Sequence, residues 1–528
     1  VRVFVDRRLN ESNDPFWLRE QGFRHRPEAY AEAFSHTFEA WEKDFPAGEI
    51  GLGIHALRSI REHYFVVISP LGDQLNFAID PMFPDDMEVH PWAEGSPPWS
   101  DRSSLIDSIS PQAEDSHAQL LAPLSRRRNL AEVYGYFRTT AAPASSTPDQ
   151  ISLTLSANPS QSLFLQWRQQ GPLVVDETPS VEFWEHRDSP HQSAEDGGEI
   201  VQVQVSAISI PAGRVLNARN TLRFRAELAP LKPDTRYQYR VVAANGESLA
   251  GPFSFRSAPL SNSSEFYFLY FGDVQEDYET FTPLLARALE NYPDPAFVVF
   301  AGDLVSRGND QDDWDTFFAA IDERLAGIPL VPTIGNHEVL PADNPDLYLS
   351  LFQLPSNGPD ELAPGRAWFS RWGQLGVVAL DSNEDGGQAE WVERILQNSD
   401  WTESIVVAHH GAYTSRPGRY NWRIREQWAP IFEQAAVSLV LQGHDHAYLR
   451  THPFFGGKIV DGQNRGTTYV IATAGGKFYP QATHNYAAKA IAETRTFQVI
   501  TVPKLGDDAR LRYRAYNEHG RLIDQVDK

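Results

Sequence analysis

Short apolar segments alternate with longer stretches of helical periodicity throughout residues 265–528. An apolar segment without polar interruption is typical of a strand that is covered on both faces, as in α/β proteins. Helical stretches such as Thr282–Asn291 and Asp312–Leu325 separate the segments. This alternation predicts an α/β domain at residues 261–528. The predicted strands are Phe266–Phe271, Phe297–Ala301, Gly376–Leu380, Ile405–Ala408 and Ser438–Leu441.

Polar motifs follow these strands or stand at comparable turns. Each motif is common when taken alone, because a Gly-Asp pair often forms a capped turn and a lone histidine is usually a surface or core residue. In open α/β sheets, however, ligands bind beyond the carboxyl ends of the strands. The series therefore predicts one functional site. Its members are Gly272–Gln275, Gly302–Gly308, Gly335–Glu338, Val406–His409 and Gly443–His446.

Residues 141–260 have a different periodicity. Apolar residues alternate with polar ones, as in Ile151, Leu153 and Leu155, which is the pattern of half-buried antiparallel strands. The same pattern recurs around Trp167 and Tyr239. We therefore predict a β-sandwich. The segment Leu231–Tyr237 resembles the corner of fibronectin type III domains, in which a tyrosine hydroxyl satisfies backbone groups.

Residues 1–140 form a mixed α+β region without an assignment. The aromatic residues Tyr30, Phe34, Phe38 and Trp41 recur at helical spacing. Strand-like segments follow at His63–Ile68 and Leu75–Ile79, and the polar stretch Trp92–Asp115 predicts a long surface loop or linker.

Composition limits the partners and the metal chemistry. The formal net charge of −24 disfavours nucleic acid as a partner. With no cysteine, any metal must be held by oxygen and imidazole nitrogen. No apolar segment approaches the ~18 residues of a membrane span. The chain opens at Val1, so we expect a removed leader and a secreted or periplasmic protein. The oligomeric state stays open.

The order of the motifs resembles the calcineurin-like metallophosphoesterase superfamily, and their details resemble the purple acid phosphatases. The details are Tyr413, Gly443–Tyr448 and Thr473–Gly476. The resemblance extends from about Ala141 to the C-terminus. It implies a four-layer α/β sandwich, with two mixed sheets flanked by helices, preceded by the fibronectin III-like domain.

The resemblance also implies a dinuclear metal centre that hydrolyses phosphoric esters with a hydroxide generated on the metals. Asp303 would bridge the two ions. Oxygen and imidazole donors suit Fe, Mn or Zn. The other implied ligands are Asp273, Gln275 and His446 for the first metal and Asn336, His409 and His444 for the second.

Two positions depart from the family. Gln275 stands where the superfamily usually has histidine and the purple acid phosphatases have glycine, and Ser306 replaces their tyrosine ligand. The amide oxygen of Gln275 is able to bind a hard cation, although less firmly than a charged ligand. The alternative is that Gln275 hydrogen-bonds a metal-bound water.

Three further residues are candidates for catalysis or substrate binding. Arg307 resembles the arginine that grips phosphate in the protein Ser/Thr phosphatases, and the alternative is a solvated loop residue. His337 is expected to donate a proton to the leaving oxygen or to orient Asp303. His410 is a candidate pocket residue, or a ligand in place of His409. Asn336 is expected to contact substrate as well as metal.

The resulting functional expectation is a phosphatase that favours phosphomonoesters. A phosphodiesterase of the same superfamily is the alternative. A non-catalytic phosphate- or carbohydrate-binding protein is a further one, in which Trp92 and Trp99 would stack on sugars, although such aromatic residues more often belong to a core.

Overall fold

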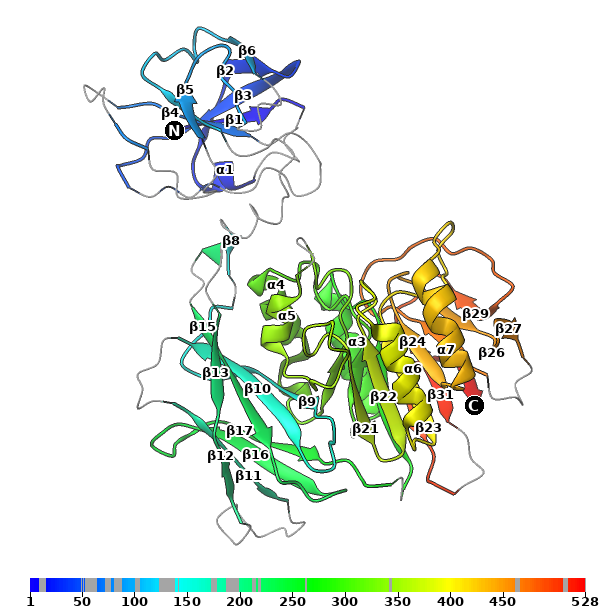
Figure 1. Cartoon of the computed structure of the whole chain (residues 1–528). Helices are drawn as coiled ribbons and strands as arrows, with labels where there is room; N and C mark the ends of the chain where they lie inside the picture. The colour runs from blue at the N-terminus through cyan, green and yellow to red at the C-terminus, as the bar shows by residue number, and fades with distance from the viewer. Residues whose placement is uncertain are drawn as a thin grey trace. The chain divides into compact units, whose positions relative to one another are not determined.

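The computed structural model describes the chain except for residues 9–15, 49, 51, 53–63, 72–76, 80–87, 100–104, 123–137, 141, 172–177, 187–198, 211–214, 217–219, 262–263, 341–343, 461–465, 507–510 and 528. Two compact units emerge: residues 1–140 with residues 213–218, and the remainder of the chain (Figure 1). Among the described residues, no helix is long and apolar enough to span a membrane.

The first unit is an antiparallel sheet with a small helix, α1 (Phe16–Glu20), and an aromatic-rich core. Its strand order is β5-β7-β4-β1-β3-β2-β6. The strands are β1 (Arg2–Asp6), β2 (Arg24–Ala33), β3 (His36–Glu42), β4 (Phe65–Ile68), β5 (Glu88–Pro91), β6 (Ile106–Ile109) and β7 (Gln119–Ala122). A short pair, β8 (Arg138–Thr139) and β14 (Val215–Leu216), completes this unit.

The helix suggested by aromatic spacing in the first unit is wrong. Those aromatic residues lie in and between β2 and β3, which form a hairpin whose turn places Phe34 and Ser35 at positive φ. The dominant period is two, because Ala29, Ala31 and Ala33 are buried while their neighbours are exposed. The alanines are too small to reveal this inward face in the sequence.

The polar stretch Trp92–Asp115 is not a linker. It contributes β6, and the Trp92 and Trp99 side chains are buried in the core of the first unit. The core interpretation of these two residues is therefore confirmed. The predicted strand His63–Ile68 appears as β4 from Phe65 onward. Of the predicted strand Leu75–Ile79, residues 75–76 lie outside the described residues, and residues 77–79 do not form a strand.

The predicted β-sandwich opens the second unit. Its strands are β9 (Asp149–Leu155), β10 (Leu163–Gln170), β11 (Ser180–Glu185), β12 (Val201–Val203), β13 (Ser206–Ile210), β15 (Thr221–Leu228), β16 (Arg236–Val242) and β17 (Ser248–Arg256). The backbone N–H of Lys232 donates to the Tyr237 hydroxyl at 2.7 Å, which confirms the tyrosine corner.

Two mixed sheets follow, and one continues the sandwich because β9 pairs with β20. This sheet has the order β13-β15-β10-β9-β20-β19-β18-β30-β31-β32. Its new strands are β18 (Phe266–Phe271), β19 (Val298–Phe300), β20 (Leu330–Pro332), β30 (Thr496–Val502), β31 (Arg512–Asn517) and β32 (Leu522–Asp527).

The other sheet has the order β21-β22-β23-β24-β28-β25-β29. Its strands are β21 (Trp368–Trp372), β22 (Leu375–Leu380), β23 (Glu403–Ala408), β24 (Leu439–Gln442), β25 (Tyr448–Thr451), β28 (Thr468–Ile471) and β29 (Ala487–Ile491). Two short strands, β26 (Phe454–Phe455) and β27 (Lys458–Ile459), form a separate pair.

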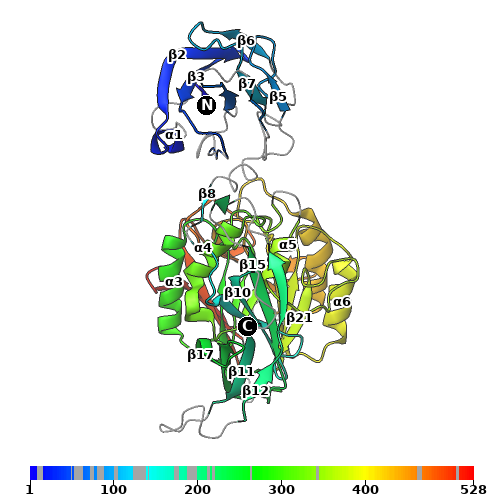
Figure 2. The same ribbon diagram turned by 90° about the vertical axis from the view of Figure 1, so that its left-hand side faces the viewer.

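Helices cover both outer faces, which confirms the four-layer arrangement (Figure 2). Alternate residues of β23 show the layering, since Ile405 and Val407 join the core between the sheets while Val406 and Ala408 join the core under the helices. The helices are α3 (Tyr278–Asn291), α4 (Gln311–Ile321), η3 (Asp322–Leu325), α5 (Asp346–Leu351), α6 (Gln388–Asn398), the π-helical turn η4 (Ile424–Trp428) and α7 (Ala429–Gln434).

Candidate metal centre

The loops after five parallel strands bring the predicted ligands together. In the first sheet these loops follow β18, β19 and β20, and in the second sheet they follow β23 and β24. Parallel neighbours end at the same edge of a sheet, so the polar motifs of both sheets meet beyond that edge. Two groups of side chains result, and Asp303 belongs to both.

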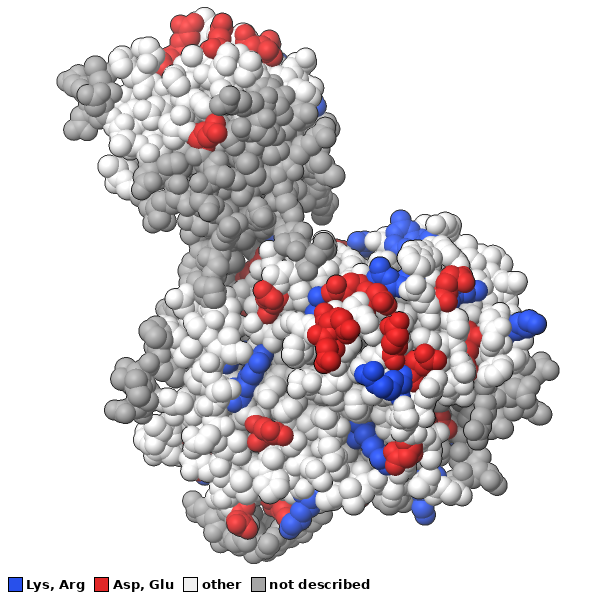
Figure 3. Space-filling view, in the orientation of Figure 1, with Lys and Arg blue, Asp and Glu red and all other residues white. Residues whose placement is uncertain are grey.

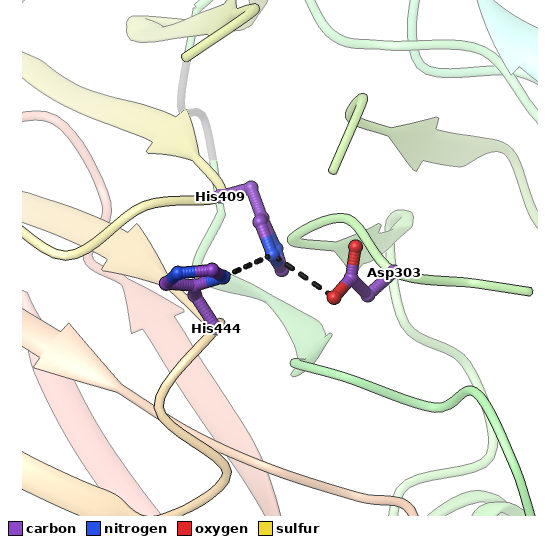
Figure 4. Close-up of side chains that lie close together, drawn as sticks. All are labelled: Asp303, His409 and His444. Atoms are coloured by element: carbon purple, nitrogen blue, oxygen red, sulfur yellow. Dashed lines mark hydrogen bonds and ion pairs between the residues drawn. The ribbon is translucent and has the colours of Figure 1, made fainter. Parts of the chain in front are cut away.

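One group is centred on His409 Nε2, which lies 3.1 Å from Asp303 Oδ2 and 3.2 Å from His444 Nδ1 (Figure 4). Asn336 Oδ1 lies 3.1 Å from the same nitrogen. The opposite nitrogen, Nδ1, lies 2.9 Å from the carbonyl oxygen of Ala301. Because a carbonyl group only accepts, Nδ1 carries the proton and the lone pair of a neutral His409 points from Nε2 into the group. Oxygen and imidazole donors that converge in this way fit a cation.

The other group contains Asp273, Asp303 and His446, whose candidate ligand atoms all lie within 4.8 Å of one another. Gln275 reaches the same place, since its Nε2 donates to Asp303 Oδ2 at 3.1 Å and lies 3.4 Å from His446 Nε2. Its Oε1 is buried and has no hydrogen-bond partner among the described residues. A buried acceptor without a donor fits a cation held beside these carboxylates.

The electrostatics of the groups also favour a cation. Burial raises the pKa of Asp273 well above its ordinary value, and the nearby Asp303 adds to the rise. For His409, burial lowers the pKa, but the charge and hydrogen bond of Asp303 outweigh burial and raise it to about 9. Burial lowers the pKa of His446 to about 4, which keeps this imidazole in its ligand form. The buried carboxylates therefore require positive charge nearby, which either a protonated His409 or a bound cation would supply.

The loops that carry these groups adopt uncommon backbone conformations. Asp273, Asp303, His444 and His446 have φ values of 42°, 52°, 72° and 47°. Positive φ in non-glycine residues costs about 1–3 kcal/mol each and is concentrated at functional sites. Close approach also requires glycine, because a Cβ at Gly335 would lie 2.2 Å from Asp303 Oδ1. The chain thus accepts strain to aim these side chains.

Glu338 holds the Asp303 loop, and sequence reasoning missed it. Its buried carboxylate accepts backbone N–H bonds from Asp303 at 2.8 Å, Leu304 at 2.8 Å, Val305 at 3.3 Å and Gly335 at 2.6 Å. Burial and the charge of Asp303 raise its pKa to about 7, against the effect of these donors. The only sequence signal was its place in the motif Gly335–Glu338.

His337 lies next to the carboxylate of Asp303, which the two groups share. Its backbone N–H donates to Asp303 Oδ1 at 3.0 Å, and its Nδ1 lies 2.7 Å from the carbonyl oxygen of Ser306. Nε2 is 4.0 Å from Asp303 Oδ2. Ser306 therefore orients this imidazole through its carbonyl oxygen.

The two other candidates already have protein partners. Arg307 forms ion pairs with Asp313 at 2.6 Å and Asp310 at 3.0 Å. His410 lies beside His444, with ring centroids 4.2 Å apart, and its Nδ1 is 2.8 Å from Ser382 Oγ. Burial and the charge of His409 lower the pKa of His410 to about 3, so the ring is neutral.

Comparisons with known proteins find similarity to phosphoesterases in the part of the chain that carries these residues. Residues 266–448 match the family model of calcineurin-like phosphoesterases, and residues 148–257 match that of the purple acid phosphatase N-terminal domain. An uncharacterized protein of Mycobacterium tuberculosis is 28% identical in an alignment 321 positions long, which covers 48% of this chain and 58% of that protein. The Fe(3+)-Zn(2+) purple acid phosphatase 12 of Arabidopsis thaliana is 23% identical in an alignment 332 positions long, which covers 58% of this chain and 66% of that enzyme.

The solved structure of the purple acid phosphatase PPD1 from yellow lupin seeds has a TM-score of 0.59 and 17% identity, and the match covers 72% of this chain and 74% of that one. At this identity the likeness concerns the fold. The chain spans little more than half the length of the mycobacterial relative. Neither family model includes residues 1–147.

Proposed function

We propose that this chain, which belongs to the calcineurin-like metallophosphoesterases and carries a purple acid phosphatase N-terminal domain, hydrolyses phosphoric esters at a centre of two metal ions. The observation that carries the proposal is the position of Asp303, which belongs to both groups of buried candidate ligands. A carboxylate shared in this way suits a bridge between two cations.

The proposed ligands divide between the two groups. Asp273, Gln275 and His446 would hold one ion, while Asn336, His409 and His444 would hold the other, with Asp303 common to both. Oxygen and imidazole donors suit Fe, Mn or Zn. Two such ions supply positive charge for the phosphoryl oxygens and lower the pKa of bound water.

His337 is the proposed proton donor to the leaving oxygen. Its Nδ1–H donates to the carbonyl oxygen of Ser306, so the proton for the leaving oxygen would come from Nε2 of the imidazolium form, on the side of Asp303. A positioned acid of this kind contributes about 10²–10⁴ in rate. The backbone N–H of the same residue holds Asp303 Oδ1, so its backbone and its side chain serve different purposes.

Arg307, His410 and Asn336 are the proposed contacts to substrate. For Arg307 a phosphoryl group must compete with the carboxylates of Asp310 and Asp313. We therefore expect Arg307→Ala to weaken inhibition by inorganic phosphate by less than about tenfold. An unchanged inhibition constant, together with a loss of stability, would mean that Arg307 stabilises its loop and does not contact phosphate.

A substrate panel tests the proposed activity. The full chain, loaded separately with Fe, Mn or Zn, is assayed with an aryl phosphate, a bis-aryl phosphate and a phosphopeptide, and metal-free protein is the control. We expect metal-dependent hydrolysis that is fastest with a monoester. Faster hydrolysis of the diester would favour the phosphodiesterase alternative, and no hydrolysis with any loaded metal would contradict the enzymatic proposal.

A further inference from the structure

Three cationic side chains surround one aromatic ring beside the candidate metal centre. The Tyr479 ring has Arg416 at 4.4 Å, Lys477 at 5.3 Å and Arg419 at 5.9 Å, measured from the charged group to the ring centroid. The face of an aromatic ring attracts cations, which explains how one ring organises several of them. We call Arg416, Lys477 and Tyr479 the cationic rim.

The rim is tied to a proposed metal ligand. The rings of Tyr479 and His446 have centroids 4.8 Å apart, and the backbone N–H of Tyr479 donates to the carbonyl oxygen of His446 at 3.3 Å. His446 Nδ1 lies 3.3 Å from the carbonyl oxygen of Lys477. These contacts fix the rim against His446, which belongs to only one of the two ligand groups.

The charges of the rim are partly uncompensated. Arg419 is not part of the rim, because its guanidinium already donates to Asp445 Oδ1 at 2.7 Å and to the carbonyl oxygen of His444 at 2.9 Å. Lys477 pairs with the carboxylate of Glu276 at a long distance of 3.8 Å, and its side chain is 34% exposed. Within the described residues, the half-buried Arg416 has no ion pair with a carboxylate.

Such a cluster is unusual in a chain with a formal net charge of −24. Figure 3 shows acidic side chains gathered near the middle of one face of the second unit. A local excess of positive charge on an acidic protein attracts anions to that place.

We propose that the cationic rim binds a second anionic group of the substrate, so that the centre prefers phosphate esters that carry an additional carboxylate or phosphate. This inference rests on the proposed phosphoesterase function. The scissile phosphoryl group belongs at Asp303, which both groups of ligands share, whereas the rim contacts His446, a member of one group only. A second anion attached to the leaving group is placed to reach it.

The test uses two substrates that differ by one charge, 4-carboxyphenyl phosphate and 4-carbamoylphenyl phosphate, with the metal-loaded full chain. We expect kcat/KM to be higher for the carboxylate. The ratio of kcat/KM for the carboxylate to that for the amide should fall about two- to fivefold in Lys477→Met and in Arg416→Met. That range corresponds to the free energy of a partly exposed ion pair. Lys477→Arg should retain the wild-type ratio.

Lys504→Met is the matched control, because Lys504 is exposed just after β30. The last residue of β30, Val502, pairs with Phe266 at the start of β18, at the edge opposite the centre. This variant should keep the wild-type preference. Equal kcat/KM for both substrates in the wild type, or an unchanged preference in Lys477→Met and Arg416→Met, would overturn the proposal.

Binding separates this inference from the proposed activity. The dissociation constants of 4-carboxybenzylphosphonate and 4-carbamoylbenzylphosphonate are measured by calorimetry in the same variants. Tighter binding of the carboxylate, reduced in the rim variants and by added salt, supports the rim even if neither ester is hydrolysed. Equal binding of both ligands contradicts the rim whether or not the esters are hydrolysed.

Discussion

Glu338 offers a sharp test of how the Asp303 loop is held. In Glu338→Gln the side chain keeps its size but retains one acceptor oxygen in place of two. In the wild type, Oε1 accepts from Leu304 and Val305, while Oε2 accepts from Asp303 and Gly335. The amide therefore leaves two buried N–H donors facing an NH2 group.

Each buried donor without a partner costs about 1–3 kcal/mol, so we expect the free energy of unfolding to fall by about 2–6 kcal/mol. That is a large part of the ~5–15 kcal/mol of a typical domain. The assay is urea denaturation of metal-free protein at pH 8, where Glu338, with a pKa of about 7, is ionised.

The exposed Glu390 on α6 supplies the control, since Glu390→Gln should change the free energy of unfolding by less than about 0.5 kcal/mol. Metal retention should also weaken in Glu338→Gln, because the Asp303 backbone is freed. A Glu338→Gln protein as stable as Glu390→Gln and equally able to hold metal would refute this account of the loop.

Three other variants probe separate parts of the structure. Gln275→Ala should weaken one of the two metal sites and Gln275→His should preserve or improve loading, as measured by titration of metal into the apoprotein; equal loading of both variants and the wild type would show that Gln275 is not a ligand. His337→Ala should lower turnover by about 10²-fold or more with its metals retained, and an unaltered kcat would remove His337 from proton transfer. Tyr237→Phe should cost about 1 kcal/mol of stability at the 2.7 Å bond from Lys232 without changing metal content; unchanged unfolding would mean that the corner is energetically neutral.

Several strands of the two mixed sheets were predictable because both of their faces are buried. Residues such as Ile405–Ala408 then form an uninterrupted apolar segment, and β23 occupies that place. Alternation predicted the sandwich for a different reason, since only one face of each of its strands is covered. In the first unit the inward face of β2 consists of alanines, and the exposed Tyr30 and Phe34 produced a false helical spacing.

The grouping of the candidate ligands was also predictable, because strand ends of parallel neighbours share an edge. What the sequence did not reveal were contacts that depend on turn conformation. Glu338, in the turn after β20, accepts from the backbone of Asp303 in the loop after β19, and Tyr479 contacts His446 from a segment without regular structure. Such contacts join residues far apart in the chain and follow no periodic pattern.

Metal content of Asp303→Ala tests the central claim most directly. The wild type and the variant are loaded with the same metal and desalted, and their metal content is measured by inductively coupled plasma mass spectrometry. Asp294→Ala is the control, since Asp294 is an exposed aspartate paired with Arg236. The shared carboxylate predicts about two ions per chain in the wild type and the control, and loss of both in Asp303→Ala. Full retention of metal by a folded Asp303→Ala protein would contradict the dinuclear centre.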